Sequence, residues 1–254
     1  MLTAITRAPA PSLAACELTF LPRVPIDFPR AAAQHRAYED CLRALGLRVL
    51  SLPALPDLPD SVFVEDPALV LDEVAILARP GAASRRPEAD AIAEALALFR
   101  PLRRIEPPAT LDGGDVFRAG RTLYAGLSRR TNPEGVAQLA AIAGPLGYAV
   151  TPVEVRGCLH LKSAACYIGR NTILADRDWI DPAPFATHRI LDVAEPWAAD
   201  VLEIGGAILM PESFPQTRFA LEAEGFPVET LDLSELQKAE SGITCMSLIF
   251  TAAG

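Results

Sequence analysis

Cys245 is the residue of this chain best placed to act as a nucleophile. It lies in GITCMSLIF, where a glycine-opened turn leads into a short apolar strand. Free cysteine is among the most buried residue types, so the alternative is a small packing residue of the core. A thiol at the mouth of a strand, however, is within reach of a substrate. Nucleophilic catalysis also needs a base and a group that orients the base, and three other segments offer both.

His160 in CLHLKS (158–163) is the histidine that we pair with this thiol. We expect the segment to be a strand in which the His160 side chain shares one face with Cys158 and Lys162, because side chains alternate between the two faces of a strand. The alternative is an ordinary hydrogen-bonded histidine of the core or surface. The other two histidines of the chain lie on an amphipathic helix and at the start of a strand (His35 and His188).

Two aspartates in LDGGDV (111–116) offer the group that orients the imidazole. Asp112 and Asp115 bracket two glycines, and we expect one of the two to cap a tight hairpin entry by accepting backbone N–H bonds. The double glycine also lets the backbone approach a ligand closely and directs Asp112 inward. Asp112 is therefore the candidate third member of a cysteine, histidine and aspartate triad.

Glu65 and Asp66 add two adjacent acids in VFVEDP (62–67), on an expected strand that Pro67 bends. Nearby carboxylates suppress thiolate formation, and a thiol with a pKa near 8.5 is already only a few per cent ionised at neutral pH. A bound guanidinium reverses the local field, since an ion pair at about 4 Å is worth on the order of 4 kcal/mol at an effective dielectric near 20. That exceeds the roughly 2 kcal/mol needed to ionise the thiol at pH 7. These residue types therefore favour a cationic substrate that helps to make the thiolate.

Short paired strands and four helices recur along the chain. The pattern strand, strand, helix, strand repeats at roughly 50-residue spacing, which is typical of internal structural repeats. Five units fit, with starts near residues 62, 113, 158 and 199, and with a fifth that joins the Cys245 strand to residues 2–7 and 29–52. The third of these units is proline-broken at 178–187 and supports at most a short helix. No linker divides the chain, so we expect one α/β domain over residues 1–254. The expected helices are 29–45, 87–99, 132–144 and 216–224.

Composition excludes several classes of protein. The net charge of −9 and the pI near 4.9 argue against nucleic-acid binding, which needs a basic surface. No apolar run approaches the roughly 20 residues of a membrane span. LAAC (13–16) has the form of a lipoprotein cleavage box, but Arg7, Pro9 and Pro11 interrupt the apolar segment that should precede it. Five cysteines without metal-binding spacing favour reduced thiols in a cytoplasm.

Seven ordered segments resemble the dimethylarginine dimethylaminohydrolases, a family of the guanidino-group-modifying pentein superfamily. The resemblance covers nearly the whole chain and implies a five-bladed α/β propeller, which agrees with the repeat pattern. The matching segments are ELTF around Leu18, LPDSVFVEDP (58–67), ARPGAASRRPE (78–88), LDGGDV (111–116), GLSRRTN (126–132), CLHLKS (158–163) and SGITCMSL (241–248).

The resemblance also implies a role for each of ten residues. Cys245 resembles the nucleophile, His160 the general acid and base, and Asp112 the acid that orients the histidine. Seven others resemble substrate contacts: Glu65 and Asp66 to the guanidinium, Asp60 to the amino group, Arg85 and Arg130 to the α-carboxylate, Leu18 in the lid loop, and Ala239 through its backbone carbonyl. Arg86 and Arg129 adjoin the two chosen arginines, so each assignment has a one-residue alternative. Ala239 is also smaller than the family residue.

Lys162 distinguishes between members of this superfamily. Arginine deiminases resemble the same pattern but have an aspartate two residues after the histidine, and a lysine cannot accept N–H bonds from an unsubstituted guanidinium nitrogen. We therefore expect hydrolysis of asymmetric dimethylarginine and monomethylarginine to citrulline and an alkylamine, without metal or cofactor, by a monomer or homodimer. The alternatives are a related guanidine hydrolase or amidinotransferase, and a non-catalytic propeller that binds a partner.

Overall fold

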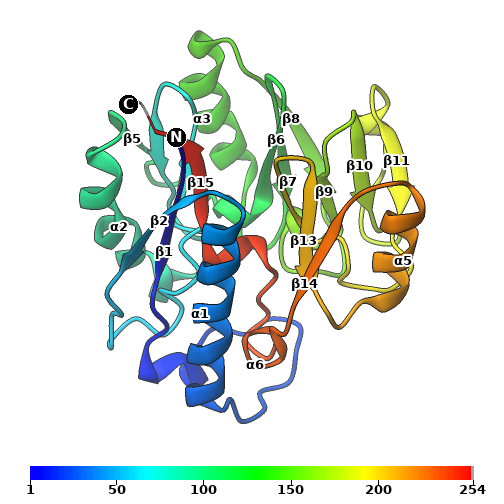
Figure 1. Ribbon diagram of the computed structural model, residues 1–254. Coiled ribbons are helices and arrows are strands. Elements are labelled where there is room, and N and C mark those ends of the chain that lie inside the picture. The colour runs from blue at the N-terminus through cyan, green and yellow to red at the C-terminus, as the bar shows by residue number, and fades with distance from the viewer. Residues whose placement is uncertain (253–254) are drawn as a thin grey trace.

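Four helices longer than two turns form where the sequence predicts them. The computed structural model describes residues 1–252 (Figure 1). Each of these helices has a proline in its first turn, where the missing N–H costs no hydrogen bond. Asp27 and Asn132 cap two of them by accepting a backbone N–H three residues on. The helices are α1 (Phe28–Ala44), α2 (Pro87–Ala97), α3 (Pro133–Ala143) and α5 (Pro215–Ala223).

Five three-stranded sheets share one topology. In each, an inner strand pairs antiparallel with a central strand, and the central strand pairs parallel with an outer strand that follows a crossover. From inner to outer the sheets are β15 (Leu248–Thr251), β1 (Leu2–Arg7) and β2 (Arg48–Leu52); β3 (Ala68–Val70), β4 (Ala75–Leu77) and β5 (Leu102–Arg104); β6 (Val116–Ala119), β7 (Thr122–Leu127) and β8 (Ala149–Glu154); β9 (Ala165–Tyr167), β10 (Thr172–Ala175) and β11 (Arg189–Asp192); β12 (Leu202–Ile204), β13 (Ala207–Pro211) and β14 (Val228–Leu231).

The two ends of the described chain meet in one sheet and close the ring. Leu2 pairs with Thr251 and Ile5 with Leu248, and the amino terminus donates to the carbonyl of Ala252 at 3.2 Å. The two ends lie side by side in Figure 1. The predicted fifth unit, built from both ends of the sequence, is thus confirmed.

The sheets pack on helices at the periphery and surround a cavity at the centre. In the second sheet, Ile92 and Leu96 of α2 are buried in one cluster with Ala75 and Leu77 of β4. The fourth sheet has no helix between β10 and β11 beyond a short 3₁₀ turn (Ala183–Phe185), as the proline-broken segment predicts. Inner-strand residues from all five sheets line a central cavity of about 440 Å³, among them Val70, Phe117, Tyr167, Leu202 and Ile249.

Two predicted strands are wrong. Residues 61–67 form turns, and β3 begins only at Ala68. Residues 158–164 are a bend followed by one helical turn, α4 (Leu161–Ala164), before β9. Val62, Phe63 and Val64 are all buried, so an apolar run here reflects an irregular segment enclosed by the ring. Among residues 1–252, no helix is long and apolar enough to cross a membrane.

Candidate active site

Cys245 lies on a 3₁₀ turn (Thr244–Met246) that leads into the inner strand β15. Its carbonyl accepts a hydrogen bond from the backbone N–H of Glu65 at 3.2 Å, which ties the turn to the second sheet. The side chain is almost fully buried and faces the same small pocket as His160. The thiol therefore lies at the edge of an apolar cluster, where the turn before β15 meets the segment that leads into the second sheet.

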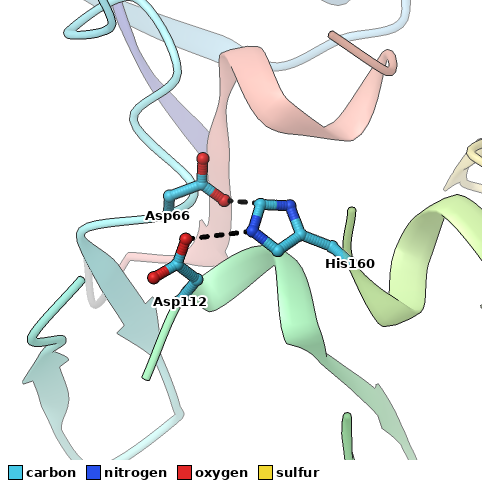
Figure 2. A group of neighbouring side chains, drawn as sticks. All are labelled: Asp66, Asp112 and His160. Carbon is cyan, nitrogen blue, oxygen red and sulfur yellow. Dashed lines mark hydrogen bonds and ion pairs between the residues drawn. The ribbon is translucent and has the colours of Figure 1, made fainter. Parts of the chain in front are cut away.

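His160 immediately precedes α4 and reaches two carboxylates (Figure 2). Its Nε2 is 3.0 Å from Oδ2 of Asp112, and its Nδ1 is 3.7 Å from Oδ1 of Asp66. A Cβ on Gly114 would lie 2.6 Å from Nδ1, so only glycine lets the imidazole approach this turn. Burial lowers the pKa of His160, but the charge of Asp66, the hydrogen bond to Asp112 and the charge of Asp115 raise it to about 9. The ring is thus an imidazolium at neutral pH.

Asp115 holds the loops around this imidazole. One carboxylate oxygen accepts the N–H of Leu161 at 2.9 Å, and the other accepts the hydroxyls of Ser128 and Thr131, both at 2.7 Å. It is the aspartate of LDGGDV that caps the turn. Asp112 is fully buried with one oxygen toward the imidazole and the other accepting the N–H of Gly81 at 2.9 Å.

Two arginines also enter the pocket. Arg85 is buried, pairs with Asp66, and donates to both oxygens of Glu88 at 3.1 and 2.7 Å. Arg130 donates to the Thr19 hydroxyl at 3.2 Å, and its Nη1 lies 3.5 Å from Asp112 without a hydrogen-bond partner. Such an unpartnered buried donor is costly and is available to an anionic ligand.

The neighbouring arginines point elsewhere, although the sequence alone leaves them as alternatives. Arg86 donates to the carbonyl of Pro80, and Arg129 stacks over the ring of Phe20. Arg85 and Arg130 are the members of the two pairs that line the pocket.

The pocket between these groups has a volume of about 20 Å³, which is room for about one water molecule. A substrate of amino-acid size can enter only if the lid loop or the arginines move. Of the ten predicted site residues, Leu18, Glu65 and Asp112 do not line this pocket; Asp112 lies behind His160, to which it is hydrogen-bonded. The lining residues are Glu17, Asp60, Phe63, Asp66, Arg85, Arg130, Leu159, His160, Ala239, Glu240, Ser241 and Cys245.

Comparison with known proteins assigns the family. A family model described as N,N dimethylarginine dimethylhydrolase, eukaryotic, matches residues 26–189. The N(G),N(G)-dimethylarginine dimethylaminohydrolase of Pseudomonas aeruginosa is 37% identical over 228 residues, which cover 88% of this chain and 90% of that protein. The protein of the same name from Streptomyces coelicolor is 40% identical over 247 residues, covering 96% of this chain and 95% of the other.

The chain belongs to the dimethylarginine dimethylaminohydrolase family. A solved structure of the Pseudomonas aeruginosa family member, a cysteine-to-serine mutant complexed with citrulline, superposes with a TM-score of 0.93 at 36% identity. The match covers 98% of this chain and all of the other. The predicted five-bladed α/β propeller is confirmed by this match and by the five sheets.

The resemblance predicts that Glu65 contacts the guanidinium of the substrate, but in the structure its oxygens are bound by other groups of the protein. Its two oxygens accept from Lys162 Nζ at 2.5 Å and from the Thr244 hydroxyl at 2.7 Å. Burial raises the pKa of Glu65 to about 7 even though the ammonium of Lys162 lowers it. Both Glu65 and Lys162 border the central cavity, so this ion pair lies between that cavity and the nucleophile turn.

The lid loop around Leu18 is held at its backbone. Asp60 accepts the N–H of Glu17 with both oxygens at 3.1 Å. Glu240 accepts the N–H groups of the three residues Thr19, Phe20 and Leu21 at 2.5 to 3.0 Å. Leu18 itself packs against the apolar cluster that contains Cys245. The structure therefore places Leu18 in a loop whose flanking residues are held by two carboxylates.

Three of these groups could also hold a cation. Ligand atoms of Asp66, Asp112 and His160 lie within 4.8 Å of one another (Figure 2). The guanidinium groups of Arg85 and Arg130 lie against the same two carboxylates and would repel a metal ion. The expectation of a metal-free reaction stays a prediction.

Sequence reasoning did not find Glu17, Phe63, Leu159, Glu240 or Ser241 among the lining residues. Glu240 adjoins the predicted Ala239, and it has a left-handed φ of +58°, which is uncommon for a side chain of this type. The sequence carries no signal for that conformation. Ser241 is the first residue of SGITCMSL (241–248), so the resemblance in this segment is a signal that could have identified it.

Proposed function

We propose that this protein hydrolyses Nω-methylated arginines, asymmetric dimethylarginine and monomethylarginine, to citrulline and dimethylamine or methylamine. The observation that supports this best is the pocket shared by Cys245, His160 and Asp66, because it combines a nucleophile, a proton donor and a buried anion. Arg85 and Arg130 at the same pocket suit an α-carboxylate, which accepts paired N–H bonds from a guanidinium.

In this proposal the substrate's guanidinium binds Asp66, and its amino and carboxylate groups bind Asp60 and the two arginines. The carbonyl of Ala239 and the lid residue Leu18 complete the enclosure. Glu65 acts from beneath the nucleophile through its negative charge, since Lys162 and Thr244 occupy its oxygens. Closure of the lid excludes water from the first step.

The bound cation makes the thiolate. Burial and the charges of Asp200, Asp66 and Glu65 raise the pKa of the Cys245 thiol well above its ordinary value. A guanidinium next to the thiol lowers that pKa, and the thiol proton leaves to solvent before the lid closes. The Cys245 sulfur then attacks the guanidinium carbon and forms a C–S bond.

His160 completes both halves of the reaction. As an imidazolium it donates a proton to the departing amine, the C–N bond breaks, and a cysteine-bound thiouronium remains. The neutral imidazole then takes a proton from water, and the hydroxide adds to the same carbon. The C–S bond breaks, and the proton on the new hydroxyl group passes to the departing thiolate, which releases citrulline and restores the Cys245 thiol. Asp112 keeps the ring oriented throughout. We place the reaction in a reducing cytoplasm, because all five cysteines are free thiols. We expect a monomer or a homodimer to perform it.

The test incubates purified protein with dimethylarginine and, separately, with arginine, and measures citrulline, dimethylamine and ammonia. Dimethylamine in equal amount to citrulline supports the proposal. Ammonia from arginine without dimethylamine would point to the related arginine hydrolase, and no product from either would point to a binding protein.

Cys245→Ser should lower turnover by at least about a thousandfold, because a serine hydroxyl is hardly ionised in this site. Acid quenching of the unmutated enzyme during turnover should trap an adduct on Cys245 that mass spectrometry detects. Cys158→Ser is the matched control, since Cys158 is equally buried but does not line the pocket. An adduct on any other residue would reject the mechanism.

A further inference from the structure

Asp200 is a buried acid beside the nucleophile turn whose charge affects the Cys245 thiol but which contacts neither the substrate nor the reacting atoms in the steps above. It precedes the inner strand of the fifth sheet, β12, and is 4% exposed. Its Oδ1 accepts the N–H of Thr244, the residue before the nucleophile, at 3.0 Å. A carboxylate that accepts a backbone N–H at the start of a 3₁₀ turn fixes that turn as an N-cap fixes a helix.

Gly242 lets this carboxylate approach the turn. A Cβ on Gly242 would lie 2.0 Å from both Cγ and Oδ2 of Asp200, so any side chain there would displace the acid. Gly242 is not among the positive-φ residues of the described chain, so backbone conformation does not require a glycine here. The glycine of SGITC is therefore explained by the Asp200 contact.

The Thr244 hydroxyl links Asp200 to a second acid. Its Oγ1 donates to Glu65 at 2.7 Å and lies 3.4 Å from Oδ2 of Asp200. Lys162, which donates to Glu65, is the cation of this group. We call Asp200, Glu65, Lys162 and Thr244 the lower cluster. It carries two acids and one ammonium below the thiol, and its net charge is negative when both acids are ionised.

We propose that Asp200 is a positioning residue for the nucleophile: it holds the turn that carries Cys245 and, through its charge, keeps the thiol protonated until a cationic substrate binds. The proposal rests on the proposed function for its second half. After burial, the Asp200 charge is the largest cause that raises the pKa of the Cys245 thiol, ahead of Asp66 and Glu65.

The protonation states of the other titratable groups near the turn also affect the Cys245 thiol. The Tyr38 hydroxyl bonds to Ser247 at 2.6 Å, and burial raises its pKa, so it remains neutral over the pH range of the test. Burial also raises the pKa of the Cys166 thiol. His160 faces the pocket from the other side as a cation. Burial raises the pKa of Asp200 itself, but the hydrogen bond from Thr244 and the charge of Lys162 favour its carboxylate. Asp200→Asn removes this charge and leaves His160, Asp112 and Asp66 unaltered.

The test compares Asp200→Asn with the unmutated enzyme in carbamidomethylation of Cys245 by iodoacetamide. Peptide mass spectrometry resolves the five thiols, and the rate is followed from pH 6.5 to 9.5. The asparagine keeps an acceptor for the Thr244 N–H but carries no charge. A fall of half to one unit in the thiol pKa makes Cys245 alkylation roughly three- to tenfold faster at neutral pH. Asp176→Asn is the matched control, because Asp176 is also a buried acid that accepts a backbone N–H, from Asp178 at 3.0 Å.

Turnover supplies the second readout. Asp200→Asn should lower kcat for dimethylarginine more than it changes KM, because a neutral amide holds the Thr244 N–H more weakly than a carboxylate does, while the substrate contacts remain. Gly242→Ala, which pushes the carboxylate away with Asp200 intact, should reproduce the fall in kcat and replaces Asp200→Asn if that variant does not fold. Alkylation and kcat equal to those of Asp176→Asn in the folded variants would overturn the proposal. Alkylation of Cys245 requires no turnover. If the unmutated enzyme does not hydrolyse dimethylarginine, the proposed function is rejected, and the alkylation rates alone then decide whether Asp200 acts on the thiol.

Discussion

Two buried charge clusters lie on either side of Cys245, and they differ in what remains open to a ligand. The catalytic cluster (Asp66, Asp112, His160, Arg85 and Arg130) contains an arginine nitrogen without a partner and borders the pocket. The lower cluster has every charged side chain hydrogen-bonded within the protein.

The adjacent residues Glu65 and Asp66 belong to different clusters, and their pKa values are shifted in opposite directions. Asp66 pairs with Arg85 and faces His160, whereas Glu65 pairs with Lys162 and Thr244. Burial opposes ionisation of both, but the cations around Asp66 hold its pKa below its usual range, while the pKa of Glu65 rises to about 7. One acid is therefore a fixed anion that can bind a cation, and the other serves the scaffold.

Among the variants that test this comparison, Asp112→Asn in the catalytic cluster should have the largest effect on activity. The amide cannot stabilise the imidazolium, so we expect kcat to fall by about a hundred- to a thousandfold with the fold intact. Steady-state citrulline formation measures it, and circular dichroism checks the fold. A fall of less than about threefold would mean that His160 needs no orienting acid.

A substitution in the lower cluster should first of all lower the free energy of unfolding. Lys162→Met leaves Glu65 and Asp200 without their cation, and breaking a buried pair costs roughly 3–5 kcal/mol. Urea unfolding measures this loss, and the double variant with Glu65→Gln should recover part of it. Lys238→Met is the control, because the Lys238–Glu235 pair is near the surface and should be worth about 1 kcal/mol or less. Equal costs for the two lysine variants would remove the distinction between the clusters and the surface.

The raised pKa of His160 predicts a pH dependence of stability. Because the folded value of about 9 exceeds the ordinary 6.5, the contribution is complete below about pH 6.5 and is lost as pH rises through 9. The loss amounts to a few kcal/mol at most. Thermal unfolding midpoints from pH 6 to 9.5 should fall more steeply in the unmutated protein than in His160→Gln. Parallel curves would show that the imidazole is neutral in the fold.

The smallest effect is expected at the edge of the catalytic pocket. Glu240→Gln leaves one acceptor oxygen for three lid N–H groups, so hydrogen exchange at residues 19–21 should become faster. A loss of about 1 kcal/mol in lid closure corresponds to about a fivefold rise in KM. Glu222→Gln is the control, since the Glu222–Arg218 pair is exposed and distant from the lid. Unchanged exchange at the lid would show that Phe20 and its aromatic contacts hold the loop without Glu240.

The sequence predicts the repeats well because each unit has local signals. Proline in the first helical turn, glycine at turns and apolar periodicity fix the helices and the order of strands, and the ring then follows from pairing β15 with β1. The strands predicted at 62–66 and 158–162 are wrong for a shared reason. Buried irregular segments are as apolar as strands, and hydrogen bonds to distant residues decide their shape: the Leu161 N–H donates to Asp115, and the Glu65 N–H donates to the carbonyl of Cys245.

The hydrogen-bond partners of Asp200 and Glu240 cannot be predicted from any local sequence pattern. Asp200 accepts from a residue 44 positions away and Glu240 from residues about 220 positions away, so their partners exist only after the ring closes. Glu65 is the converse case. The resemblance predicts a guanidinium contact for Glu65, but the sequence cannot tell which of the two clusters its side chain joins, because residues 61–67 form turns in which adjacent side chains point in different directions.

The pairing of β15 with β1 has a consequence for the newly made protein. Strand β1 leaves the ribosome first and can pair with β2 early, but its other edge stays open while the remaining four sheets are synthesised. An unpaired edge of this kind is a site for wrong association with other chains. The segment that covers this edge also carries Cys245, so the thiol reaches its place in the pocket in the same event that protects the nascent chain from aggregation.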